Sequence, residues 1–136
     1  MPTSKVLYLG GLRSKSTHLA SGNDIVTDAP VDNHGKGEAF SPTDLLATSL
    51  GNCMITVMGI KANASGWNID GTTVEITKHM GTDPRRVVQI DAVVTFPAND
   101  FDDRTKKVLE HTALTCPVSK SLHPDLVQNI TFHWPA

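Results

Sequence analysis

Residues 40–66 read FSPTDLLATSLGNCMITVMGIKANASG, and this stretch predicts one long helix with Cys53 near its middle. Ser41 can cap the first turn with its hydroxyl, and Pro42 fits the first helical position, where no N–H is needed. Asp44 follows Ser41 by three residues and gives an acidic form of the capping box. Its charge also suits the positive end of the helix dipole.

The apolar residues of this helix recur at steps of four and three. They are Leu46, Leu50, Cys53, Val57 and Ile60. Residues at this spacing share one face of a helix, so we expect Cys53 on the buried side. Gly66 is expected to end the helix, because it tolerates the left-handed conformation. A cysteine on such a face is most simply a small core residue, since free cysteine is among the most buried residue types.

Further apolar residues surround much of the helix. Among them are Leu45, Met54, Ile55 and Met58. A helix that is apolar on most sides needs more cover than one sheet provides. We therefore expect a homodimer that encloses the helices between two subunits.

Length, charge and cysteine content limit the classes of protein to consider. The 136 residues are enough for a single domain, 1–136, with its own core. A net charge of −2 gives no basic footprint for nucleic acid. We see no signal peptide and no run of membrane-spanning length, so no membrane partner is expected. Two cysteines do not make a disulfide scaffold, and a reducing, cytoplasmic setting is the expectation.

The remaining chain predicts short strands separated by turns, and two further helices. The strands are expected at 5–9, 12–20, 25–27, 72–79, 86–96 and 130–134. The helices are expected at 100–115 and 118–122. The first three strands suggest an antiparallel meander, and the next two a hairpin. Strands and helices do not alternate regularly, so the predicted class is α+β with mainly antiparallel sheet.

Both cysteines are candidates for chemistry. Cys116 directly precedes Pro117, so it is expected at the start of a short helix, where the dipole and free N–H groups would lower its pKa. Cys53 has no such help and would need a cation such as Arg13, or a donor from the polar loop 28–39. Together the two cysteines suggest a redox pair, although 63 residues separate them.

Other site chemistries receive less support from the sequence. The six histidines show no zincin spacing and no Cys-x-x-Cys partner, so we expect no metal. A papain-like cysteine hydrolase would need a histidine beside its nucleophile; His34 could be recruited, but nothing local supports this. Phosphate-binding and dinucleotide-binding glycine motifs are absent, and no cofactor is expected.

Three blocks of sequence resemble the OsmC/Ohr family of thiol peroxidases. They are Ser41–Leu46 (SPTDLL), Ser49–Cys53 (SLGNC) and Thr115–Ser119 (TCPVS). The loop from TDAP at 27–30 to GEAF at 37–40 resembles the OsmC-like branch of this family. The resemblance extends over nearly the whole chain and includes both cysteines. It implies an OsmC-like fold with a long central cysteine-bearing helix, and an intertwined homodimer with two sites at the subunit interface.

The resemblance also implies a mechanism. The family reduces organic hydroperoxides in oxidative or osmotic stress defence, without metal or flavin. Cys53 would attack the peroxide, Cys116 would resolve the resulting sulfenic acid to a disulfide, and a dithiol reductant such as a dihydrolipoyl protein would reset the enzyme. This order conflicts with the local argument that Cys116 is the more acidic thiol, and we follow the family.

An arginine from the N-terminal strands and a glutamate near the helix start complete the family's site. Arg13 matches the arginine by region. The position of the family glutamate is Thr43 here, so either Glu38 or Asp44 would hold Arg13. We favour Glu38, because Asp44 already has a capping role. The alternatives are a non-catalytic small-molecule binder or redox sensor on the same fold, and other cysteine chemistry.

Overall fold

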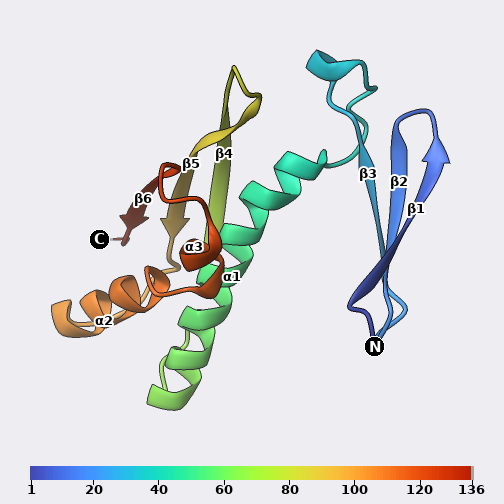
Figure 1. The fold of residues 1–136 in the computed structure, drawn as a ribbon. Helices are drawn as coiled ribbons and strands as arrows, with labels where there is room; N and C mark the ends of the chain where they lie inside the picture. The colour runs from blue at the N-terminus through green and yellow to red at the C-terminus, as the bar shows by residue number, and fades with distance from the viewer. Residues whose placement is uncertain (136) are drawn as a thin grey trace. The chain divides into compact units, whose positions relative to one another are not determined.

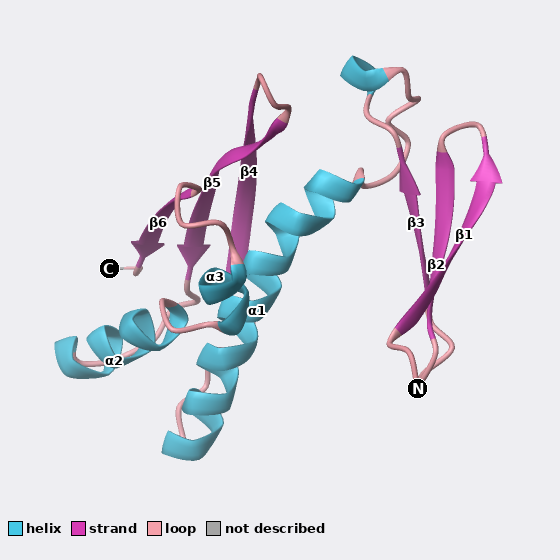
Figure 2. Ribbon diagram, in the orientation of Figure 1, coloured by secondary structure: helices cyan, strands magenta, loops and turns pink. Residues whose placement is uncertain are grey.

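The structure is a computed structural model, and it describes residues 1–135. The chain divides into two compact units, Met1–Leu46 and Ala47–Ala136. Strands, a long helix, two strands, two helices and a last strand follow one another in the predicted order (Figure 1). The α+β class is confirmed (Figure 2). That residues 1–136 act as one domain stays a prediction.

The N-terminal unit contains a three-stranded antiparallel sheet. Its strands are β1 (Ser4–Gly10), β2 (Arg13–His18) and β3 (Asp24–Asp28), in the order β1-β2-β3. This is the meander that the turn signals predicted. A short 3-10 helix, η1 (Val31–Asn33), lies in the polar loop that follows.

The C-terminal unit contains the second sheet. Strands β4 (Thr73–Gly81) and β5 (Arg86–Thr95) pair antiparallel, and β6 (Val127–His133) pairs parallel with β5. A parallel neighbour needs a crossover connection. Helices α2 (Asp103–Ala113) and α3 (Pro117–Ser121) form it, and the strand order is β4-β5-β6 (Figure 1).

Helix α1 (Pro42–Ser65) occupies the segment in which the sequence predicted a long helix, and both predicted ends are confirmed. The N–H of Ser41 donates to Asp44 Oδ2 at 3.0 Å, and the N–H of Asp44 donates to Ser41 Oγ at 3.1 Å. This reciprocal pair is a capping box. Gly66 follows the last turn with φ +74°. The place of this helix at the centre of a dimer stays a prediction.

The predicted buried face of α1 is partly wrong. The residues that are buried are Ala47, Leu50, Gly51, Met54, Met58 and Ala62. Leu46 and Ile60, expected inside, are 42% and 65% exposed. Three of the buried residues are alanine or glycine, which carry little apolar surface but let a helix approach its neighbours closely. A Cβ on Gly51 would meet Ile76 of β4 at 3.2 Å.

The core of the C-terminal unit lies between α1, α2 and one face of the second sheet. Its fully buried side chains include Leu50, Met54, Met58, Ile90 and Leu109.

Helix α1 is long and apolar enough to cross a membrane by length and composition alone, with a mean hydropathy of 1.3 over its most apolar 18 residues. The expectation that no run of the chain has this length is therefore wrong. Core helices of soluble proteins pass the same test, and α1 contributes six residues to the buried set.

Candidate active site

The two cysteines lie side by side in the C-terminal unit, both as free thiols. Cys53 is partly exposed on α1, two and a half turns after the capping box. Cys116 is fully buried and caps α3, where its Sγ accepts the N–H of Ser119 at 3.3 Å. The Cys53 thiol is close enough to hydrogen-bond with Cys116. Neighbouring thiols are the arrangement from which a disulfide can form on oxidation.

The pKa of Cys116 is raised above its ordinary value of 9.0, contrary to the prediction from its place at a helix start. Burial is the largest cause, because it disfavours the charged thiolate. The N–H of Ser119 lowers the pKa, and the neighbouring Cys53 raises it again. With only five residues, α3 supplies too little dipole to offset the burial of the sulfur.

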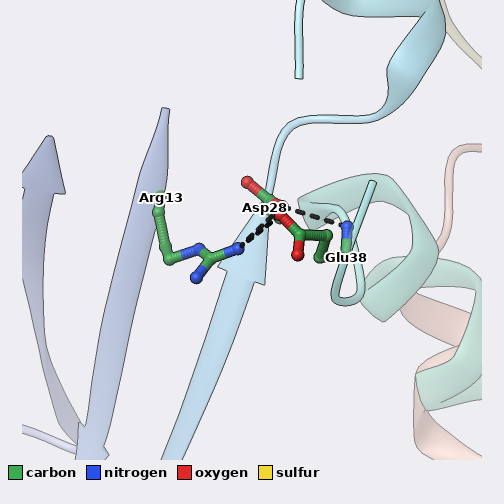
Figure 3. Close-up of polar contacts among 3 residues, drawn as sticks. All are labelled: Arg13, Asp28 and Glu38. Atoms are coloured by element: carbon green, nitrogen blue, oxygen red, sulfur yellow. Dashed lines mark hydrogen bonds and ion pairs between the residues drawn. The ribbon is translucent and has the colours of Figure 1, made fainter. Parts of the chain in front are cut away.

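Arg13 contacts two carboxylates in the N-terminal unit through the same nitrogen of its guanidinium (Figure 3). Its Nη2 lies 3.1 Å from Asp28 Oδ2 and 3.5 Å from Glu38 Oε1. The backbone N–H of Glu38 donates to the same oxygen of Asp28 at 3.0 Å. The side chain of Asp28 is 1% exposed, whereas that of Glu38 is 61% exposed. Arg13 therefore has one buried acidic partner and one exposed one.

Asp28 was not predicted as a site residue, although it is the buried one of the two carboxylates that contact Arg13. Its pKa is lowered, first by the backbone N–H of Glu38 and then by the hydrogen bond from Arg13, while burial opposes both. Its second oxygen, Oδ1, is buried and accepts no hydrogen bond within residues 1–135. Arg13 and Asp28 face each other in the β2–β3 register. That register was the available signal, because the turn between the two strands sets it.

The structure also separates the two candidate acids. Glu38 contacts Arg13, whereas Asp44 holds the first turn of α1 in the capping box. The pair of Arg13 with Glu38 belongs to the N-terminal unit, and the pair of cysteines to the C-terminal unit. The catalytic role of all four residues stays a prediction. Across residues 1–135, no group of three or more His, Cys, Asp or Glu side chains could hold a metal ion.

These features occur on a fold that is shared with known proteins. A family model described as OsmC-like protein matches residues 35–130. The chain belongs to the OsmC-like protein family. No curated protein matches it in sequence. A solved structure from Psychrobacter arcticus 273-4 is 58% identical, with a TM-score of 0.94 over 98% of this chain and 96% of that one. That protein is described as a candidate osmotic stress induced and detoxification response protein.

More distant OsmC-like structures share the fold. An organic hydroperoxide resistance protein OsmC from Legionella pneumophila is 14% identical, with a TM-score of 0.69 over 100% of this chain and 98% of that one. An organic hydroperoxide resistance protein from Elizabethkingia anophelis is also 14% identical, with a TM-score of 0.75 over 99% of this chain and 98% of that one. At this identity the likeness shows the fold alone.

Proposed function

We propose that this OsmC-like protein is a two-cysteine thiol peroxidase that reduces organic hydroperoxides in stress defence. The observation that supports this most is the adjacency of Cys53 and Cys116, which lie 63 residues apart in the chain. One thiol is partly exposed and the other is buried beside it. This arrangement suits a first thiol that meets the substrate and a second that waits for the oxidised product.

The proposed reaction has three steps. The thiolate of Cys53 attacks an oxygen of the hydroperoxide, the O–O bond breaks, and the alkoxide leaves and is protonated to the alcohol. Cys116 then attacks the sulfur of the Cys53 sulfenic acid, an S–S bond forms, and the S–O bond breaks to release water. A dithiol, such as a dihydrolipoyl group on a partner protein, reduces the disulfide by thiol–disulfide exchange and becomes oxidised itself.

Arg13 has the proposed role of stabilising the Cys53 thiolate and the charge that develops on the peroxide oxygens. Glu38 and Asp28 would hold its guanidinium, since each contacts it. A guanidinium stays protonated over the whole range in which a thiol titrates, so it is a dependable partner for a thiolate. Neither metal nor cofactor has a part in this scheme.

A homodimer in the cytoplasm is the proposed assembly. Strand β1 supports it, because its apolar side chains are at least half exposed in the single chain. These are Val6, Leu7, Tyr8 and Leu9. Such a patch is more typical of an interface than of a free surface. In the proposed assembly the partner subunit covers it and completes each site.

The test is the loss of cumene hydroperoxide with dihydrolipoamide as reductant. We expect turnover in the wild type, none in Cys53→Ser, and a trapped sulfenic acid on Cys53 in Cys116→Ser. If the wild type shows no turnover and its thiols stay reduced in excess peroxide, the peroxidase proposal fails. A non-catalytic binder on the same fold would then be the better account, and it would tolerate Cys53→Ser without functional loss.

A further inference from the structure

Gln128 breaks the pattern of strand β6. Side chains alternate along a strand, so Gln128 shares its face with Ile130 and Phe132, which pack against the core. An apolar residue is expected at such a position. A half-buried amide on a core face costs free energy unless its polar atoms are hydrogen-bonded. The partners of this amide therefore indicate what the residue does.

Both ends of the Gln128 amide bond to one residue, Ser119 of α3. The hydroxyl of Ser119 donates to Gln128 Oε1 at 2.6 Å, and Gln128 Nε2 donates to the carbonyl oxygen of Ser119 at 3.0 Å. The backbone N–H of Ser119 in turn donates to the sulfur of Cys116 at 3.3 Å. Gln128 thus fixes the residue whose N–H points at the sulfur.

The short helix needs this support. With five residues, α3 is below the length at which a helix is stable by itself. Cys116 caps the first turn and Ser119 lies in it, so fraying of this turn would move the Ser119 N–H away from the sulfur. The amide of Gln128 ties this turn to β6, which is hydrogen-bonded along its length to β5.

We propose that Gln128 is a positioning residue for Cys116, which it holds through Ser119 in the place from which Cys116 attacks the sulfur of Cys53. The inference rests on the proposed function, because that function gives Cys116 its resolving role. In the step concerned, the Cys116–Cys53 S–S bond forms, the S–O bond of the sulfenic acid breaks, and the leaving hydroxide takes up a proton as water.

The electrostatics of Cys116 agree with this role. Burial raises the pKa of the thiol, and the neighbouring titratable group, Cys53 of α1, raises it further. The N–H groups of Ser119 and Val118 lower it. Without the Gln128 amide, Ser119 would be held less firmly, and the hydrogen bond from its N–H to the sulfur of Cys116 would weaken. The thiolate of Cys116 would then form only at higher pH, and the resolving step would slow.

The resolving step can be measured without any hydroperoxide. The aromatic disulfide dithiobis(nitrobenzoate) should react first with Cys53, the partly exposed thiol of the pair, and release one coloured thiolate. Attack of Cys116 on the resulting mixed disulfide forms the Cys53–Cys116 bond and releases a second coloured thiolate. We expect Gln128→Leu to slow the second release about tenfold, to shift its pH profile upward, and to leave the first release unchanged.

Two further variants separate positioning from general stability. Ser119→Ala keeps only the bond from Gln128 Nε2 to the Ser119 carbonyl, so its second release should slow by less. Gln89→Leu is the matched control, because Gln89 is also half-buried, lies in the same sheet and donates a side-chain hydrogen bond, to Asp91 at 2.7 Å. It should leave both releases unchanged. If Gln128→Leu is too unstable to purify, the comparison of Ser119→Ala with Gln89→Leu decides.

Three results would overturn the inference. The first is a second release that is unchanged in Gln128→Leu, or in Ser119→Ala if Gln128→Leu cannot be purified. The second is an equal slowing of that release in the control Gln89→Leu. The third is the absence of a second release in the wild type. The peroxidase proposal fails separately, if the wild type shows both releases here but neither thiol reacts with cumene hydroperoxide. In that case the inference that Gln128 positions Cys116 would still hold, and the thiol pair would act on disulfides instead of hydroperoxides.

Discussion

Folding lowers the pKa of the Asp28 carboxyl. It is buried, and it accepts hydrogen bonds from the N–H of Glu38 and from Arg13. Both favour the charged form, so its pKa falls below the ordinary 3.8. A group whose pKa is lower in the folded state stabilises the fold above the unfolded-state pKa. That contribution is lost as the pH falls through the folded-state pKa.

We therefore expect Asp28→Asn to melt at a lower temperature than the wild type at neutral pH. The difference should shrink as the pH is lowered below about 4, because the carboxyl of the wild type is then protonated first in the unfolded chain and, at still lower pH, in the folded protein too. Thermal unfolding followed by circular dichroism across this range measures it. Asp70→Asn, at an exposed acid, is the control. A melting difference that stays constant down to the lowest pH would contradict this assignment.

Glu38 and Asp44 can be told apart by what each substitution damages. Glu38→Gln should lower the peroxidase rate by about fivefold, the effect of about 1 kcal/mol from an exposed charge pair, with little loss of stability. Asp44→Ala should cost about 1 kcal/mol of stability, because it opens the capping box, and should spare the rate. Steady-state rates and urea unfolding measure the two effects. If Asp44→Ala lowers the rate and Glu38→Gln lowers only the stability, Asp44 and not Glu38 is the residue that holds Arg13.

Helix α1 contains two glycines with different surroundings. A Cβ on Gly51 would lie 3.2 Å from Ile76 and 3.3 Å from Val74, whereas a Cβ on Gly59 would meet nothing within 4 Å. Alanine favours helix over glycine by about 1 kcal/mol. We expect Gly59→Ala to stabilise the protein by about this amount and Gly51→Ala to gain less or to destabilise it. Denaturant unfolding of both variants decides, and equal gains would show that α1 does not pack closely on β4 at Gly51.

The sequence predicted these elements better than their packing. The capping residues Ser41 and Asp44 and the stop at Gly66 are local signals, and α1 begins and ends where they predicted. The bounds of other elements differ from the prediction: the last strand, expected at 130–134, is Val127–His133, and the helix expected at 100–115 is Asp103–Ala113. The buried face of α1 was partly missed, because helix periodicity weighs large apolar residues and the close contact is made at Gly51.

The candidate site was predicted only where its residues have recognisable neighbours in sequence. Cys53 and Cys116 each lie in a distinctive block, and the structure brings the two together. Asp28 and Gln128 were missed, because their importance depends on strand register and on contacts with distant residues. No local pattern distinguishes a strand-end aspartate or an inward glutamine from a solvated one.

At the scale of the whole molecule, the proposed homodimer depends on β1, whose apolar side chains Val6, Leu7, Tyr8 and Leu9 are at least half exposed. We expect light scattering to give twice the mass of one chain. The double variant Val6→Lys with Tyr8→Lys should give a monomer that has lost peroxidase activity, because charges would lie on one face of the proposed interface. Thr131→Lys, at an exposed position of β6, should stay dimeric and active. A wild-type monomer with full activity would contradict a site shared between subunits.

The central claim is that Cys53 and Cys116 form one redox pair. The most direct measurement is mass spectrometry of the protein after one equivalent of cumene hydroperoxide, with peptide mapping. We expect the loss of two hydrogens per chain and one pair of peptides joined by a disulfide between Cys53 and Cys116. Dihydrolipoamide should reverse both changes fully. Thiols that remain reduced, or a stable oxidised Cys53 that never joins Cys116, would contradict it.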